Sequence, residues 1–195
     1  MKQNMEPMVF GLLGENPVRE PLHYRACGLD NVYLCSGFIQ EEVDGEMYTS
    51  VTGVNDLYIM IAFRLSLLRR ALAGMELRFL RKYLDLTQQE LADQFGLTRK
   101  TVNAYECDRE PAPWANQRLL QVTVLSQLMK HLRKLVEEGD MHLYERFHPE
   151  LEDLIDYLLH TTRVLDAAKD AEERRLIGSA TIGHWKMQTD QCCSA

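Results

Sequence analysis

Apolar residues at three- and four-residue steps predict a first helix in the middle of the chain. The stripe is made of Leu57, Ile61, Leu65, Leu68 and Leu72. Asn55 or Asp56 is a candidate N-cap, and Gly74 is expected to end the helix.

Two longer helical segments follow. The first spans 114–138, and its stripe is formed by Val122, Leu125, Met129, Leu132 and Val136, widened by Leu128 and Leu135. The second is predicted from Pro149 to about Leu176, since proline suits the first turn of a helix. Periodicity alone leaves two interpretations of these stripes open, a packed core or a dimer seam.

The N-terminal third has a different pattern. Residues 1–21 contain three prolines and are expected to be irregular. Loose alternation from His23 onward, the Asp44-Gly45 pair and the return segment 47–51 predict an antiparallel sheet of two or three strands with a hairpin.

These patterns predict a mainly α chain with a small N-terminal antiparallel β module, a central helix-turn-helix domain and long C-terminal helices. The expected boundaries are 1–62 for the β-rich module and 63–113 for the helix-turn-helix domain. They are 114–178 for the helical region, serving dimerisation or core packing, and 179–195 for a flexible tail.

Composition narrows the class of protein. The chain has 195 residues, 46% of them hydrophobic, and a formal net charge of −7. No apolar run reaches the roughly 18 residues that a membrane span needs, and the N-terminus lacks the pattern of a secretory signal. We therefore expect a cytoplasmic protein without membrane contact, whose five cysteines are reduced thiols. Residues 63–113 are the only third with more basic than acidic side chains.

The segment 76–113 carries the strongest signals. Thr87 with Glu90 forms a capping box that opens a short helix from Gln88 to Phe95. Gly96 suits the left-handed residue that ends it, and Thr98 caps a third helix from Arg99 to about Glu106. Two short helices joined by a tight glycine-containing turn are typical of a helix-turn-helix.

This segment resembles the lambda-repressor/Cro-like (XRE) helix-turn-helix over about 38 residues. The matching positions are Leu77-Arg78, Thr87-Gln88, Glu90-Leu91-Ala92, Gly96-Leu97-Thr98, Val102, Tyr105-Glu106 and Pro111 or Pro113. One departure is Cys107-Asp108, where the family usually has a glycine-containing turn. The resemblance implies a DNA-binding domain that works as a dimer on a two-fold symmetric site.

A weaker likeness covers more of the chain. The segment 24–34, followed by strands, a helix and the same motif, is similar to MqsA-type antitoxins and regulators. Those antitoxins hold zinc with two CxxC pairs, and this chain has none. The likeness therefore implies the same architecture, a small N-terminal β module followed by a helix-turn-helix, and no metal site.

Each candidate DNA-binding residue has a physical role. Arg99 and Lys100 lie at the start of the recognition helix, where arginine can pair with guanine O6 and N7. The resemblance places Gln88 at a phosphate. The complete set of candidates is Gln88, Gln89, Thr98, Arg99, Lys100, Thr101, Asn103, Arg78, Arg81 and Lys82. Arg81 and Lys82 are equally well explained as solvated charges.

Other chemistry has little support. His23, Cys27 and Cys35 have loose spacing and no fourth ligand, so buried thiols explain them better than a metal site. We find no GxSxG, P-loop, HExxH or Cys-His pattern, and we expect neither an enzyme nor a cofactor. A hydrolase containing a decoy helix-turn-helix is an alternative without support in the residues.

The sequence therefore predicts a sequence-specific transcriptional regulator, acting as a homodimeric repressor on a palindromic operator in double-stranded DNA. One alternative is an antitoxin that neutralises a toxin and autoregulates its operon. Another is an activator that contacts polymerase.

Overall fold

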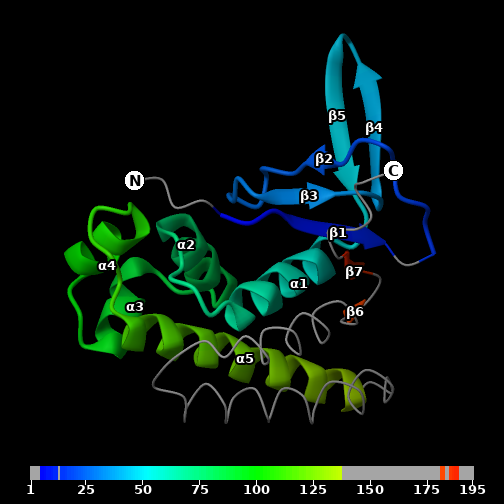
Figure 1. Cartoon of the computed structure of the whole chain (residues 1–195). Coiled ribbons are helices and arrows are strands. Elements are labelled where there is room, and N and C mark those ends of the chain that lie inside the picture. Colours follow the sequence, from blue (N-terminus) through cyan, green and yellow to red (C-terminus); the bar gives the residue numbers. More distant parts are fainter. Residues whose placement is uncertain (1–4, 13, 138–180, 183–184, 189–195) are drawn as a thin grey trace. The chain divides into compact units, whose positions relative to one another are not determined.

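The computed structural model describes residues 5–12, 14–137, 181–182 and 185–188. These residues form five helices and seven strands (Figure 1). The chain divides into two units: Met1–Met60 together with Ala171–Ala195, and Ile61–Asp170. Among the described residues, no helix is long and apolar enough to cross a membrane.

A five-stranded mixed sheet organises the first unit. Its strands are β1 (Met8–Leu12), β2 (Leu22–His23), β3 (Val32–Leu34), β6 (Thr181–Ile182) and β7 (Trp185–Gln188), in the order β2-β3-β1-β7-β6. β1 runs parallel to β3 and antiparallel to β7. All five residues of β1 are buried, as expected for a central strand that is covered on both faces.

The core of this unit surrounds β1. Phe10, Leu29, Leu34 and Trp185 are fully buried. The indole Nε1–H of Trp185 donates to the carbonyl of Thr52 at 2.9 Å, which satisfies its polar atom. A residue near the C-terminus therefore completes a core that begins at residue 8.

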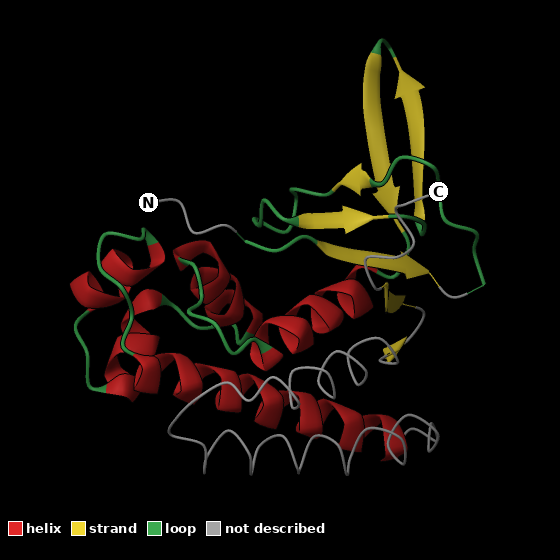
Figure 2. Ribbon diagram, viewed as in Figure 1, coloured by secondary structure: helices red, strands yellow, loops and turns green. Residues whose placement is uncertain are grey.

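The predicted hairpin is confirmed. β4 (Phe38–Val43) pairs antiparallel with β5 (Glu46–Val51) as a separate two-stranded sheet (Figure 2). Asp44 and Gly45 have φ of 54° and 81°. Positive φ at both central residues is what a two-residue hairpin turn requires.

Helix α1, Val54–Leu67, is shorter than predicted at its C-terminal end. It begins at Val54, so the expected N-caps Asn55 and Asp56 lie inside it. Gly74 does not end this helix but opens the next one. Leu68 and Leu72 extended the apolar pattern beyond the end of the helix. Both are buried, but they lie in the segment that connects α1 to α2 and not in a helix.

The second unit holds α2 (Gly74–Tyr83), α3 (Gln88–Phe95), α4 (Arg99–Glu106) and α5 (Trp114–Glu137). The long helix predicted over 114–138 is thus confirmed. Its buried face differs from the predicted stripe: Leu120, Val124, Leu125 and Leu128 are buried, together with Gln117 and Gln121, whereas Val122 and Met129 are only half-buried.

Two buried glutamines explain that difference. The Gln121 side chain donates to the carbonyls of Leu65 and Leu68 at 3.0 and 2.9 Å, where α1 ends. Gln117 accepts from the Leu72 amide at 2.8 Å. Both amides satisfy backbone groups that would otherwise be unpaired. A polar residue can therefore occupy the core face, which hydrophobicity alone does not reveal.

The prediction of a mainly α chain with a small antiparallel β module is wrong. The described residues contain a mixed sheet with a parallel pair, and that sheet uses both ends of the described chain. β1 lies within 1–21, which was expected to be irregular, and β6 and β7 lie within 179–195, which was expected to be a flexible tail. The helix predicted from Pro149 to Leu176 lies outside the described residues.

Candidate nucleic-acid interface

Local capping signals define α3 as the sequence predicts. The amide of Glu90 donates to Thr87 Oγ1 at 3.2 Å, and the Glu90 carboxylate accepts from the Thr87 amide at 2.7 Å. These bonds hold the pKa of Glu90 below its ordinary value, the Thr87 backbone bond contributing most. Gly96 ends the helix at φ 64°. The predicted capping box and C-cap are both confirmed.

Helix α4 begins two residues after that glycine. The Thr98 hydroxyl accepts from the Thr101 amide at 3.1 Å, which confirms Thr98 as the N-cap. Arg99 and Lys100, the first two helical residues, are both exposed. Free backbone N–H groups and two cationic side chains therefore meet at this end of α4, an arrangement that favours anions.

A buried ion pair fixes the other end of α4. The Glu106 carboxylate accepts from Arg81 of α2, with Arg81 Nη2 at 3.0 Å from Oε2. It also accepts from Gln88 Nε2 of α3 at 2.9 Å. The side chains of Arg81 and Glu106 are only 9% and 3% exposed. One carboxylate thus ties together all three helices of the motif.

A close approach between α2 and α4 adds a second tie. A Cβ on Gly74 would lie 2.6 Å from the carbonyl oxygens of Tyr105 and Glu106, so only glycine fits there. The Gly74 amide donates to Asp108 Oδ1 at 2.6 Å. Asp108 itself has φ 53°. It takes the left-handed conformation that glycine usually supplies after a helix. The turn after α4 can therefore form without the glycine that the helix-turn-helix family usually has there.

The structure separates the ten predicted DNA-binding residues by accessibility. Six are exposed, namely Arg78, Lys82, Gln89, Thr98, Arg99 and Lys100; three are half-buried, namely Gln88, Thr101 and Asn103; and Arg81 is buried. The guanidinium of Arg81 bonds to Glu106 and to the Leu86 carbonyl at 2.6 Å. Arg81 is therefore a structural residue and does not line the surface, contrary to expectation.

Several candidates already have partners within the motif. Gln88 donates to Glu106, and Gln89 Nε2 donates to Asp93 Oδ1 at 2.8 Å. The hydroxyls of Thr98 and Thr101 lie 2.8 Å apart. These bonds orient the side chains, so a phosphate or base would meet preset groups at the start of α3 and α4.

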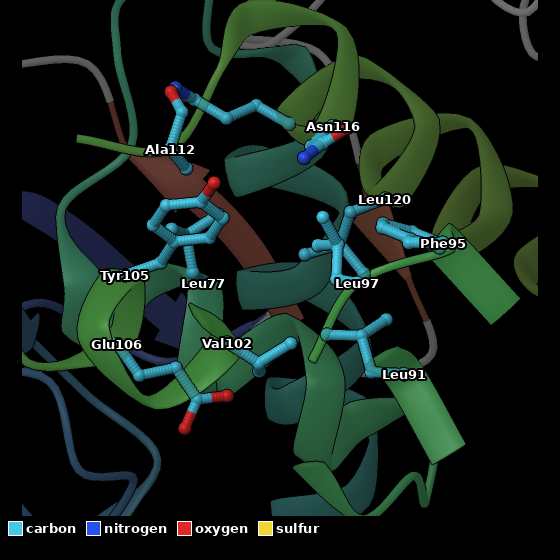
Figure 3. A pocket seen from close by; sticks show the side chains of 11 residues that line it. Leu77, Leu91, Phe95, Leu97, Val102, Tyr105, Glu106, Ala112, Asn116 and Leu120 are labelled. Carbon is cyan, nitrogen blue, oxygen red and sulfur yellow. The ribbon is translucent and has the colours of Figure 1, made fainter. Parts of the chain in front are cut away.

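A small apolar cavity lies between the helices of the motif and α5 (Figure 3). Its volume is about 30 Å³, and Leu91, Leu97 and Val102 are among its lining residues. Ala112 and Leu120 line it from the segment before α5 and from α5 itself. A space of this size holds no more than a water molecule or two, so it belongs to the packing and not to a small-molecule site.

The two thiols of the first unit that the structure describes each donate to a backbone carbonyl. Cys35 Sγ donates to the Phe10 carbonyl at 3.2 Å, and Cys27 Sγ to the Tyr24 carbonyl at 3.5 Å. Burial raises the pKa of Cys27. The His23 ring stacks on Tyr33, with ring centroids 4.9 Å apart. Within the described part of the chain, no group of three His, Cys, Asp or Glu residues is placed to hold a metal ion.

Sequence reasoning missed the roles of three residues that hold the motif together. They are Glu106, Asp108 and Gly74. Glu76, a fully buried carboxylate, accepts two bonds from Arg70 and one from the Ala73 amide and so holds the start of α2. The spacing of Arg81 and Glu106 carries no local signal, since the pair spans 25 residues.

The comparisons with known proteins add no relative. No family model, no curated protein and no solved structure matches this chain.

Proposed function

We propose that the chain is a sequence-specific DNA-binding transcriptional regulator, and that α4 is its recognition helix. On this proposal it acts in the cytoplasm as a homodimeric repressor on a palindromic operator. The observation that carries the proposal is the cationic, exposed N-terminal end of α4 on a motif whose opposite end is held by the Arg81–Glu106 pair. A recognition helix needs this combination of rigid support and free donors near its start.

The proposal gives the individual residues distinct roles. Arg99 and Lys100 would enter the major groove and reach base edges, and Asn103, one turn further on, would pair with adenine. The start of α3, with Gln88 and Gln89, would contact phosphate through its N–H groups and amides. Arg78 and Lys82 are exposed on α2 and would add phosphate contacts.

The net charge of −7 is compatible with this role. Affinity for DNA depends on the number of cations placed at phosphates, which is a local quantity. The acidic total predicts weak non-specific binding, and the local contacts of cations with phosphates predict a marked loss of affinity with added salt. A dimer would place its two recognition helices about 34 Å apart, one turn of the duplex.

The first test is protection of the DNA upstream of the gene by the purified full-length protein at low ionic strength. We expect a protected site with two-fold symmetry. If that DNA is not protected, and a pool of random duplexes yields no preferred sequence either, the proposal is wrong.

The second test is Arg99→Ala. Loss of one bidentate base contact should weaken binding to the selected site by about 1–3 kcal/mol and relax the preference at one base pair. Lys130→Ala is the matched control, because it removes an exposed cation of α5 outside the motif. Titration against single-base variants measures both effects. An unchanged preference at every position would contradict the assignment of α4.

A further inference from the structure

The β4–β5 hairpin, residues 38–51, is unusually exposed and strongly acidic. It contains Glu41, Glu42, Asp44 and Glu46 and no lysine, arginine or histidine. Every residue from 39 to 50 is exposed. Figure 1 shows the two strands extending beyond the strands of the five-stranded sheet in the same unit. We call residues 38–51 the acidic arm.

The root of the acidic arm is held firmly. The Gly37 amide donates to Glu15 Oε2 at 2.7 Å, and the Thr52 amide donates to the Gly37 carbonyl at 2.9 Å. Gly37 has φ 79°, and a Cβ there would lie 2.6 Å from the Trp185 ring. Trp185 also holds the Thr52 carbonyl. The arm is thus an exposed element on a buried base, with its starting direction set.

One face of the arm alternates apolar and acidic side chains. The cross-strand pairs Ile39–Ser50, Glu41–Tyr48 and Val43–Glu46 share this face. Ile39, Val43 and Tyr48 are 60%, 49% and 54% exposed. Large apolar side chains at such exposure on consecutive pairs mark a surface that gains stability when another chain covers it.

The outer edges of the arm are also free among the described residues. β4 and β5 pair only with each other, so each strand has one edge of unpaired N–H and C=O groups. Free edges of this kind are templates for strand addition. Two arms would repel each other through four carboxylates apiece, which disfavours pairing between copies.

The charge of the arm also selects the class of partner. Nucleic acid and anionic membranes are both negatively charged, so the arm is repelled from them. An extended segment bearing lysine or arginine between apolar residues complements both features of the exposed face. Along the free edge of β4, a cation of such a segment would lie beside Glu41, and its apolar side chains on the same face would lie beside Ile39 and Val43.

We propose that the acidic arm binds an extended, basic segment of another protein by strand addition. Edge hydrogen bonds supply the alignment, and the alternating face supplies the specificity. This interaction uses none of the residues assigned to DNA, so it stands independently of the proposed regulator function.

The test uses the full-length protein and labelled synthetic peptides of about eight residues, which lies within the usual range of strand lengths. The probe repeats Val-Thr-Lys-Thr, which places valine and lysine in alternation on one face of a strand, and a second peptide has glutamate in place of each lysine. We expect fluorescence anisotropy to detect binding of the valine–lysine peptide only. Backbone amide shifts in an NMR titration should fall on residues 38–51.

Two variants identify the site. Glu41→Lys with Glu46→Lys reverses the charge of the proposed face and should weaken binding by about tenfold or more. Glu6→Lys with Glu110→Lys is the matched control, with the same change of net charge at exposed positions outside the arm. Its binding should stay near that of the unaltered protein. Circular dichroism verifies that both variants fold.

Four outcomes of the peptide experiments would overturn the proposal. They are absence of binding, equal loss in both variants, shifts outside the arm, and equal binding of a peptide whose central residues are proline, because proline cannot complete the strand ladder. Self-association that the Glu41→Lys/Glu46→Lys variant changes, seen by sedimentation, would assign the arm to a second copy of this chain and overturn it as well.

Discussion

Helix α4 and the acidic arm are both short, exposed elements with a fixed root, and they carry opposite charges. The root of α4 is Glu106, buried against Arg81, and its exposed end has Arg99 and Lys100. The root of the arm is Gly37 against Trp185, and its exposed part carries four acidic residues and no basic one. A buried root gives each element a defined direction at little entropic cost on binding. On the two proposals, the charge of each element selects its partner: an anion for α4 and a cationic segment for the arm.

The largest effect is expected when the acidic arm loses the buried side chain at its root. Trp185→Ala should lower the free energy of unfolding by about 3–5 kcal/mol, because it removes a fully buried aromatic side chain. It also removes the bond to the Thr52 carbonyl, so binding of the valine–lysine peptide should fall. Urea unfolding and the anisotropy titration measure the two effects.

Trp114→Ala is the control for that variant. Trp114 is 39% exposed on α5, where its ring lies 4.1 Å from the Arg118 guanidinium carbon. The same residue change there should cost clearly less. Equal destabilisation by the two substitutions would show that Trp185 does not complete the core of the first unit.

The corresponding change at the root of α4 is Glu106→Ala. It leaves the Arg81 guanidinium buried without its carboxylate, which should cost about 3–5 kcal/mol of stability. DNA binding should fall as well, since α4 loses its ties to α2 and α3. Urea unfolding and titration of the selected operator measure these losses.

A double substitution sharpens that result. Arg81→Met with Glu106→Leu replaces the pair by apolar side chains and should recover most of the stability. Recovery of stability without recovery of DNA binding would assign the pair to positioning of α4. If the single and double variants are equally unstable, the ion pair is not the interaction that fixes this end of the helix.

The smallest expected effect concerns the cap of α3. The pKa of Glu90 is lowered in the folded state, so its charged form stabilises the fold at pH values above the ordinary glutamate pKa. This contribution is lost as the pH falls through the lowered, folded-state pKa. Relative to Glu90→Gln, the unaltered protein should therefore lose its advantage in acid. Unfolding midpoints measured across that range test this, and a difference that is constant with pH would contradict it.

The elements of the motif were predictable because their signals are local. Thr87, Glu90, Gly96 and Thr98 act within one helical turn of their own positions, and the structure places α3 and α4 at the predicted residues. The hairpin was predictable for the same reason, since Asp44-Gly45 sets its own turn. Accessibility was less predictable, as Arg81 shows, because burial depends on a partner 25 residues away.

The mixed sheet was not predictable from these patterns. The strand Met8–Leu12 is short and uniformly apolar, so it lacks the alternation that identifies a half-buried strand. Its neighbour Trp185–Gln188 lies far away in the sequence, and nothing within either segment indicates the other. The buried face of α5 was missed for a related reason, because Gln117 and Gln121 are stabilised by the connecting segment after α1.

The amino-acid order by itself determined the capped helices, the turn between β4 and β5, and the cationic residues that begin α4. Each depends on backbone conformations and hydrogen bonds within a few neighbouring residues. Only the tertiary structure decided that residues 8–12 and 185–188 share a sheet, that Arg81 is buried, and that the acidic arm remains exposed. Those outcomes depend on which apolar surfaces and charges meet after long loops close, and such contacts are set by packing over the whole fold and not by any local pattern.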